Sequence, residues 1–344
     1  MIRDSGFGIR DSGFGIRDSG FGIRDSGVIY VLMGGRLGNQ LFQYASARAL
    51  QEKFYPSYTI KANFYYFQNL SESQKSDKGW ENSLRFFRIR NVEYISEPPG
   101  KTKKLFQRAL TFGRRQIMKI FPSVAWRFVD NNLLQPIYNL CGIYRSPYCT
   151  ILTGPLPSFS RNIFCECSFS WNLRDFDSIR EFLLEDFTPL YDILPHNQQL
   201  MSDIQGSESV CVTIRRGDFL APEHEARHNV CNEEYFVTAM KAIREEIPGC
   251  KFFVFSDDVD DVKRNMHFPF DVTYERGNDP VWEKLRLMYS CRHFIISNST
   301  FSWWAQYLSR NPGKIVYAPI PWLWDGGNGE SIYSSYVRTI RCHR

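Results

Sequence analysis

The sequence predicts an α/β protein with two halves, each built around a sheet covered by helices. At 344 residues, the chain is long enough for two domains of ordinary size. After Gln205, short apolar runs alternate regularly with helical patterns, which is typical of a parallel sheet. Near the start, an apolar run at 28–33 leads through a glycine-rich turn into an amphipathic helix. We therefore expect two Rossmann-like halves that face each other across a cleft.

The first 27 residues are predicted to lie outside the folded part. Residues 2–27 repeat the heptapeptide Ile-Arg-Asp-Ser-Gly-Phe-Gly almost perfectly. A period of seven suggests a coiled coil, but two glycines per repeat oppose a helix and the apolar residues do not follow coiled-coil spacing. We interpret residues 1–27 as a disordered repeat tail with no share in the core.

A strand, a glycine-rich turn and a helix open the first half, which we assign to residues 28–200. The turn covers 34–39, and the helix, predicted at 40–53, carries one apolar stripe made of Leu41, Phe42, Ala45, Ala49 and Leu50. Such units often bring backbone amides up to an anion. A tight connection without a ligand would explain the turn equally well.

The second half, residues 201–344, follows the polar segment 192–209, which we interpret as the linker. Its predicted strands cover 210–214, 251–255, 272–274, 293–297 and 315–318. Its predicted helices cover 233–246, 279–290 and 302–310. This half is expected to bind the main ligand.

The buried strand at 210–214 ends abruptly in Arg215, Arg216, Gly217 and Asp218. Charged residues are rarely buried without a partner, and ligands of open α/β sheets bind at the carboxyl ends of the strands. Because guanidinium groups bind phosphate and carboxylate well, the segment points to a phosphorylated small molecule. An internal Arg–Asp salt bridge at the strand end is the alternative.

Two further loops are predicted at the same edge of the sheet. Residues 297–304 run from a strand through Ser299, Thr300 and Ser302 into a helix, whose free amides suit a phosphate. The alternative is that Ser299 or Thr300 only caps the helix. The pair Asp257-Asp258 follows another strand, and we expect it to bind ligand hydroxyls or cap the next helix rather than hold a metal.

Composition and charge narrow the class of partner. Hydrophobic residues make up 43% of the chain and charged residues 23%, which is ordinary for a soluble globular protein. The net charge of +5 is spread along the chain, so no nucleic-acid partner is expected. The nine cysteines are odd in number, and the pair Cys165 and Cys167 has no second pair, so we expect no zinc site and a reduced setting.

No apolar run reaches the roughly 20 residues of a membrane span. The start of the chain has no apolar signal region. Residues 101–119 carry seven basic side chains and no acidic one, and the apolar residues of this stretch lie at roughly helical spacing, which suits either an anionic membrane surface or a solvated helix face. We expect a cytoplasmic protein that could also lie peripherally at the inner face of the membrane.

Four segments, taken in order, resemble the motifs of α-1,2-fucosyltransferases of the bacterial type, glycosyltransferase family 11. They are residues 34–45 (Gly-Gly-Arg-Leu-Gly-Asn-Gln-Leu-Phe-Gln-Tyr-Ala), 213–218, 255–258 and 297–304. The resemblance extends from Val28 to about Ala318. It implies a GT-B-like fold, GDP-L-fucose as donor and no metal or cofactor. It also implies inverting transfer to the 2-hydroxyl of a terminal galactose, on an oligosaccharide or a surface-polysaccharide unit.

The resemblance assigns roles to individual residues. Arg215 would bind the donor diphosphate and neutralise the leaving GDP, while Arg216 and Asp218 would hold the loop and the donor. The remaining donor-binding positions that it implies are Gly35, Arg36, Asn39, Asp257, Asn298, Ser299 and Thr300.

One position departs from the family pattern. The motif usually opens with His, whereas this chain has Thr213, which cannot act as a base near neutral pH. We expect Thr213 to be structural, with its hydroxyl donating a hydrogen bond in place of an imidazole. For the catalytic base, Glu223 is the first candidate, because distantly related fucosyltransferases place a glutamate similarly, and Asp218 is the second.

Two alternatives stay open. One is a fucosyl or other GDP-sugar transferase of different regiochemistry. The other is an inactive relative that binds a GDP-sugar or a glycan, with Thr213 marking lost activity. Slow donor hydrolysis would distinguish a transferase from a binding protein.

Overall fold

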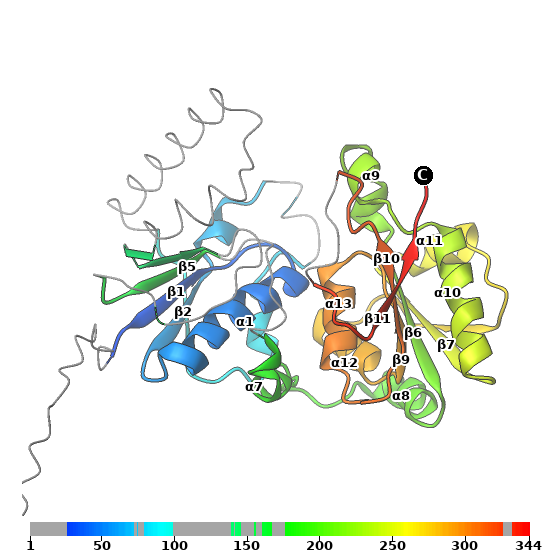
Figure 1. Cartoon of the computed structure of the whole chain (residues 1–344), viewed down its shortest axis with the longest axis horizontal. Coiled ribbons are helices and arrows are strands. Elements are labelled where there is room, and N and C mark those ends of the chain that lie inside the picture. Colours follow the sequence, from blue (N-terminus) through cyan, green and yellow to red (C-terminus); the bar gives the residue numbers. More distant parts are fainter. Residues whose placement is uncertain are drawn as a thin grey trace, which may run out of the picture.

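The computed structural model describes residues 26–98 without 72–73 and 75–78, residues 139–145 without 141, residues 155 and 160–166, and residues 176–325 and 332–344. In these ranges the chain forms two parallel sheets, one in each half (Figure 1). The first has the strand order β3-β2-β1-β5-β4, and the second has the order β11-β10-β9-β6-β7-β8. The α/β prediction is confirmed.

The first sheet is centred on β1, which pairs with β2 and β5. The regular elements of this half are β1 (Val28–Leu32), α1 (Leu37–Phe54), β2 (Thr59–Asn63), β3 (Val92–Ile95), β4 (Ile143–Arg145), β5 (Ile163–Glu166) and α7 (Arg180–Asp186), with short 3₁₀ turns at Tyr65–Asn69 and Leu84–Phe86. The ladder continues one residue before β1, because the Gly27 carbonyl accepts a hydrogen bond from the Thr59 amide at 3.1 Å. The end of the segment interpreted as a tail therefore contributes to the sheet.

Helix α1 is buried on almost all sides, so the expectation of a single apolar stripe is wrong. The five stripe residues are fully buried, but so are polar side chains, namely Gln40, Gln43, Ser46, Arg48 and Gln51. Most of these polar groups have internal partners; for example, Arg48 donates to the Gln51 side chain at 2.8 Å, although its Nε only approaches Asp186 at 3.6 Å. A helix enclosed by packing on all sides needs such internal partners.

Among the described residues, the second half contains twelve helices and strands, including all eight for which the sequence predicts bounds. They are α8 (Gln198–Gln205), β6 (Ser209–Ile214), α9 (Pro222–His228), α10 (Glu233–Glu246), β7 (Lys251–Ser256), α11 (Val259–Asn265), β8 (Val272–Tyr274), α12 (Val281–Tyr289), β9 (His293–Ile295), α13 (Thr300–Leu308), β10 (Val316–Ile320) and β11 (Val337–Arg341), with 3₁₀ turns at Pro195–Asn197 and Gly217–Leu220. The polar segment 192–209 is not a plain linker, because it contains α8. Strand β11 was not predicted.

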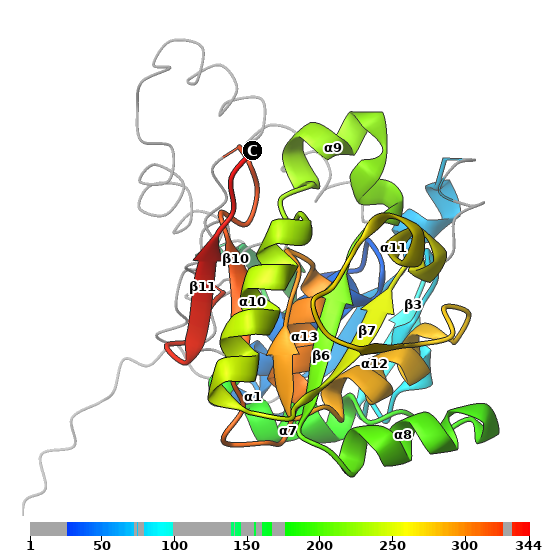
Figure 2. The ribbon, with the colours of Figure 1, turned by 90° about the vertical axis from the view of Figure 1, so that its right-hand side faces the viewer.

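The strand order places a topological switch point between β6 and β9. From β6 the chain runs outward through β7 and β8, then returns to add β9, β10 and β11 on the other side. Figure 2 shows β6 and β7 in this sheet, with α10 and α11 packed over one face. Ligands of open α/β sheets bind at the carboxyl ends of the strands beside such a switch point. In this chain, the carboxyl ends of β6 and β9 are the loops that begin at Arg215 and Ile296.

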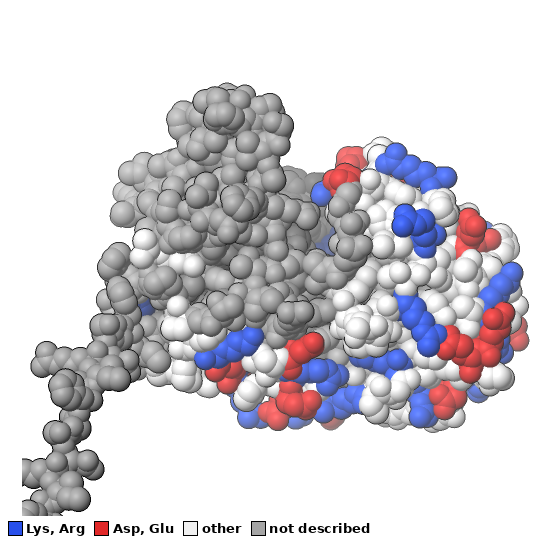
Figure 3. Space-filling view, in the orientation of Figure 1, with Lys and Arg blue, Asp and Glu red and all other residues white. Residues whose placement is uncertain are grey.

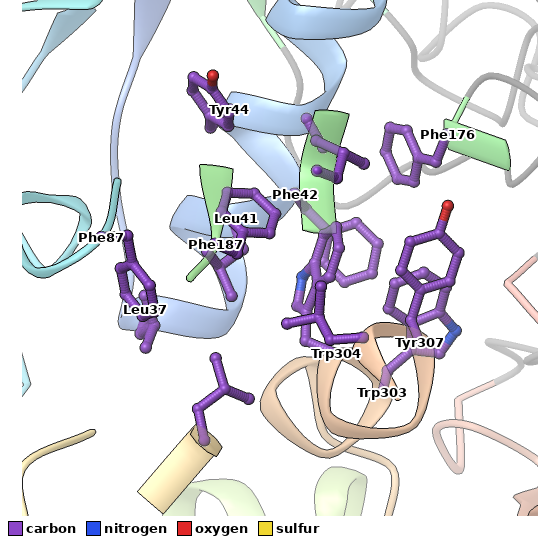
Figure 4. Packing of buried hydrophobic residues seen from close by; sticks show 14 of the residues in the cluster. Leu37, Leu41, Phe42, Tyr44, Phe87, Phe176, Phe187, Trp303, Trp304 and Tyr307 are labelled. Carbon is purple, nitrogen blue, oxygen red and sulfur yellow. The ribbon is translucent and has the colours of Figure 1, made fainter. Parts of the chain in front are cut away.

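The two halves share one aromatic core where α1 meets α13 (Figure 4). The Phe42 ring of α1 lies 4.7 Å from the Trp303 ring and 4.8 Å from the Trp304 ring, measured between centroids. Trp304 also contacts Phe187, at 5.2 Å. Because large buried aromatic rings dominate core energetics, this contact fixes α13 against the first half.

Acidic and basic side chains are interspersed over the coloured surface in Figure 3. Among the helices of the described residues, none is long and apolar enough to cross a membrane. The basic stretch 101–119, interpreted above as a possible membrane contact, lies outside the described residues.

Candidate active site

The loop after β6 meets the start of α1 through a chain of ion pairs. One Asp218 oxygen contacts the Arg215 guanidinium, and the other lies 3.6 Å from Nη1 of Arg36 in the first half. Nη1 of Arg215 also lies 3.0 Å from Oδ2 of Asp257, at the carboxyl end of β7. Three segments far apart in the sequence therefore converge, and the residues that meet, Arg36, Arg215, Asp218 and Asp257, are all among the predicted donor-binding positions.

The internal Arg–Asp salt bridge, left open as an alternative, is present. It does not use all of Arg215, because its buried Nε–H has no hydrogen-bond acceptor among the described residues. A buried donor without a partner costs about 1–3 kcal/mol. The guanidinium also lies over the Phe219 ring, 5.0 Å from its centroid. Arg215 is thus held in place, and its two ion pairs do not use all five of its N–H donors.

The Arg216 side chain holds the loop, and it pairs with a different carboxylate from the two that Arg215 contacts. Its guanidinium pairs with Asp261 of α11, and its backbone amide donates to Oδ1 of Asp257 at 2.8 Å. The hydrogen bond from Arg216 is the main factor that lowers the pKa of Asp261. Asp258 caps α11, accepting from the Asp261 amide at 2.9 Å, which is one of the two roles expected for the Asp257-Asp258 pair.

The glycine-rich turn after β1 is fixed by its own helix. Gly35 has φ +73°, a conformation that favours glycine. Gln43 accepts from the Gly34 amide, and Gln40 donates to the Gly35 carbonyl, each at 2.9 Å. Asn39 is half-buried on the first turn of α1, with its Nδ2 only 2.4 Å from where a Gly35 Cβ would lie.

The N-terminus of α13 lies directly against the first turn of α1. A Cβ added to Gly38 would lie 2.4 Å from Oγ1 of Thr300 and 2.6 Å from the Phe301 amide nitrogen. Trp304 Nε1 donates to the Gly38 carbonyl at 3.1 Å, which fixes this approach. Two helix N-termini therefore converge, and each concentrates unpaired amides and partial positive charge.

Ser299 is the N-cap residue of α13 but makes no side-chain capping bond, so the helix-cap alternative is wrong for this residue. The Ser302 hydroxyl is buried and bonded to the Ser297 hydroxyl at 3.0 Å, so it is not presented at the helix terminus. Ser299 and Thr300 remain the hydroxyl residues at this terminus.

Thr213 is structural in the sense expected, but its hydrogen bond runs in the opposite direction. The side chain is buried in β6, and Oγ1 accepts from the Ser297 amide at 3.1 Å instead of donating. The bond ties β6 to the loop before α13. It stabilises the switch point itself.

Asn298 is occupied with holding neighbouring loops. Its Nδ2 donates to the carbonyls of His228 and Trp322, both at 2.9 Å, and its Oδ1 accepts from the Cys231 thiol at 3.6 Å. Glu223 lies exposed on the first turn of α9, with no hydrogen bond or ion pair to the described residues. The structure thus does not bring Glu223 into the ion-pair chain of Arg36, Asp218 and Arg215.

The sequence model of Glycosyl transferase family 11 matches residues 151–324, which is half of the chain and includes the loops after β6, β7 and β9. The chain belongs to glycosyl transferase family 11. It is therefore a glycosyltransferase, and its two parallel sheets, joined at their carboxyl edges, form the GT-B-like architecture that the motifs imply.

Two relatives of this family-11 chain cover nearly all of it. It is 28% identical over 303 residues to the α-1,2-colitosyltransferase of Escherichia coli, covering 86% of this chain and 92% of the relative. It is 26% identical over 317 residues to the O-antigen biosynthesis glycosyltransferase WbnK of E. coli, covering 88% and 97%. A galactoside 2-α-L-fucosyltransferase of Caenorhabditis elegans matches 118 residues at 26% identity, 32% of each chain.

Solved structures are similar at a lower level. Fucosyltransferase NodZ from Bradyrhizobium aligns with TM-score 0.43 and 14% identity, covering 82% of this chain and 93% of NodZ. POFUT1 in complex with GDP aligns with TM-score 0.44 and 14% identity, covering 86% and 98%. Similarity this low says nothing about the geometry of the present site.

Three contributions to the site were not predicted. Asp261 pairs with Arg216, Phe219 supports Arg215, and Asn298 braces the end of α9. The only sequence signal for Asp261 was its place three residues after the helix cap Asp258. The roles of Phe219 and Asn298 depend on tertiary packing, which the sequence pattern does not contain.

Proposed function

We propose that this chain transfers L-fucose from GDP-β-L-fucose to the 2-hydroxyl of a terminal galactose, giving an α-1,2 linkage with inversion and without a metal. The observation that carries the proposal is the convergence of two helix N-termini, at Arg36 and Ser299, beside the Arg36–Asp218–Arg215 chain. Amide-rich helix termini and guanidinium groups are the usual ligands of a diphosphate.

The charges of the site support a metal-independent reaction. Breaking the bond between the sugar C1 and the phosphate oxygen leaves an oxocarbenium-like sugar, and the electron pair departs with GDP. Arg215, whose ion pairs with Asp218 and Asp257 leave N–H donors unused, and the amides at the start of α13 would stabilise that developing charge.

The choice of a 2-hydroxyl acceptor rests on the relatives. The E. coli α-1,2-colitosyltransferase and the C. elegans galactoside 2-α-L-fucosyltransferase share the 1,2 linkage in their names, although the second matches only a third of this chain. The first relative also favours a second candidate donor, GDP-colitose. Colitose differs from fucose by the absence of the C3 hydroxyl, so both donors would place the same diphosphate in the site.

The test measures GDP release from each donor, with lactose or N-acetyllactosamine as acceptor and EDTA present. We expect release that rises with acceptor and persists in EDTA, and NMR of the product should give an α-1,2 linkage to galactose. Arg215→Ala should lose roughly 10²–10³-fold in rate, the usual effect of removing one electrostatic contact to the transition state.

Arg310→Ala is the matched control, because the Arg310 side chain is 66% exposed and its one ion pair among the described residues is a 3.8 Å surface contact with Glu181. A different linkage would contradict the regiochemistry, and loss of activity in EDTA would contradict metal independence. GDP binding without release from either donor would identify an inactive binding protein.

A further inference from the structure

A half-buried histidine stands beside the ion-pair chain. His228 is the last residue of α9, and its imidazole lies 5.2 Å from the Phe219 ring, between centroids. The Arg215 guanidinium lies over the same Phe219 ring at 5.0 Å. The imidazole centre is therefore at most about 10 Å from the Arg215 guanidinium carbon. That range leaves room for one sugar between the imidazole and a diphosphate bound at Arg215.

Three consecutive carbonyls at the end of α9 are held by neighbouring loops. The Trp324 amide donates to the Arg227 carbonyl at 3.1 Å, Asn298 to the His228 carbonyl at 2.9 Å, and Trp324 Nε1 to the Asn229 carbonyl at 2.9 Å. The last carbonyls of a helix have no partners within the helix. Because Asn298 directly precedes Ser299, this brace couples the backbone of His228 to the start of α13.

The hydrogen bonding of the imidazole defines its tautomer. Nδ1 of His228 lies 3.3 Å from the carbonyl oxygen of His224. A carbonyl only accepts, so Nδ1 carries the hydrogen and Nε2 of the neutral ring keeps its lone pair. An imidazole bonded in this way can accept a proton at Nε2.

The burial of His228 favours the neutral ring. Burial lowers the pKa of His228, and Arg227 and His224 on its own helix lower it further. The hydrogen bond to the His224 carbonyl and the charge of Asp218 act in the opposite direction but do not reverse the shift. Arg227 is itself paired with Asp325 at 2.7 Å. His228 is thus ready to accept a proton at neutral pH.

We propose that His228 is the general base that deprotonates the acceptor hydroxyl, an inference that rests on the proposed function. Nε2 takes the proton as the acceptor oxygen bonds to C1 of the sugar. The bond from C1 to the phosphate oxygen breaks, and its electron pair leaves with GDP. The imidazolium then returns its proton to solvent.

The two carboxylates predicted for this role are placed less well. Both oxygens of Asp218 already contact guanidinium groups, of Arg215 and of Arg36. Glu223 is exposed and has no partner among the described residues that would orient it. His228 is held at its backbone and at its ring, as a general base requires.

The experiment compares His228→Gln and His228→Ala with Glu223→Gln and with a control, His267→Ala, whose ring is 85% exposed. We expect the His228 variants to lose roughly 10²–10⁴-fold in transfer rate at pH 7.5 while GDP affinity stays within about threefold. Wild-type kcat should decrease as the pH falls and His228 becomes protonated. The rate that remains in His228→Ala should not show this decrease at acid pH. Free imidazole should restore part of that rate. His267→Ala should behave as wild type.

An NMR titration of the wild-type imidazoles gives a readout that does not require transfer. It should show His228 protonated at Nδ1, with a pKa below the ordinary value, and its resonances should move when GDP binds. Two results would overturn the inference: a His228→Gln rate within threefold of wild type in a folded protein, or an Nε2-protonated ring that is insensitive to GDP. An inactive wild type in which His228 still titrates as described would instead count against the proposed function.

Discussion

At the scale of single residues, the site is electrically balanced. Arg36, Arg215 and Arg216 are matched by Asp218, Asp257 and Asp261 through ion pairs. What distinguishes the site from an ordinary salt-bridge network is the close approach of two helix N-termini, and a glycine makes that approach possible. Gly38 leaves space for Thr300 and Phe301 that no side chain would leave.

Gly38→Ala is predicted to weaken both folding and donor binding. The added Cβ would lie 2.4 Å from Oγ1 of Thr300, so α13 has to move away from α1, and overpacking of this kind costs about 1–3 kcal/mol. Thermal unfolding and GDP titration measure the two effects. Gly313→Ala is the control, because its Cβ would meet its nearest neighbour at 3.7 Å. If Gly38→Ala and Gly313→Ala had the same thermal stability and the same GDP affinity, neither folding nor donor binding would require the close approach of α13 to Gly38.

At the scale of elements, α13 connects the site to the rest of the molecule. Its N-terminus contacts Gly38, its aromatic face packs on α1, and its last carbonyls accept hydrogen bonds from Arg180 and Lys314. Cations at a helix C-terminus are favourable. The Lys314 amine is not fully charged at neutral pH, because burial and the nearby Arg180 lower its pKa to about 7. The charge of Asp177 acts in the opposite direction but does not reverse the shift.

The lowered pKa of Lys314 predicts a specific dependence of stability on pH. Between about pH 7 and 10 the unfolded chain binds a proton that the folded amine lacks, so the free energy of unfolding should rise with pH, by at most about 1.4 kcal/mol per unit from this group. Lys314→Met should remove that part of the slope. Urea unfolding of both proteins across this range measures it, and identical slopes would show that the amine stays charged.

The elements that the sequence predicts well are those with a strong local pattern. β6 and β7 are buried strands, α10 and α12 are amphipathic helices, and all four lie within two residues of the predicted bounds. Strand β11 was missed because its sequence Val-Arg-Thr-Ile-Arg is half-exposed at a sheet edge. The burial of α1 on all sides was missed because its polar residues find partners only in the folded molecule.

At the scale of the whole molecule, the two sheets meet through shared packing rather than through a flexible connection. The motifs predicted which loops carry the chemistry, since strand ends and helix starts are local features. They did not predict which arginine pairs with which aspartate, nor that Asn298 and His228 belong together, because contacts such as Arg36–Asp218 and Asn298–His228 join segments far apart in the sequence. The sequence therefore predicts which loops form the site better than it predicts which residues of these loops contact each other.

The most direct test is calorimetric titration of GDP into the wild type, Arg36→Ala and Arg215→Ala, with Arg310→Ala as control. If the diphosphate lies between the two helix N-termini, a substitution in either half should weaken binding by roughly 10–100-fold, the effect of losing one charge-assisted hydrogen bond. Arg310→Ala should bind as the wild type does. Wild-type affinity in Arg36→Ala, alongside weak binding in Arg215→Ala, would confine the nucleotide to the second half and contradict a site shared by both.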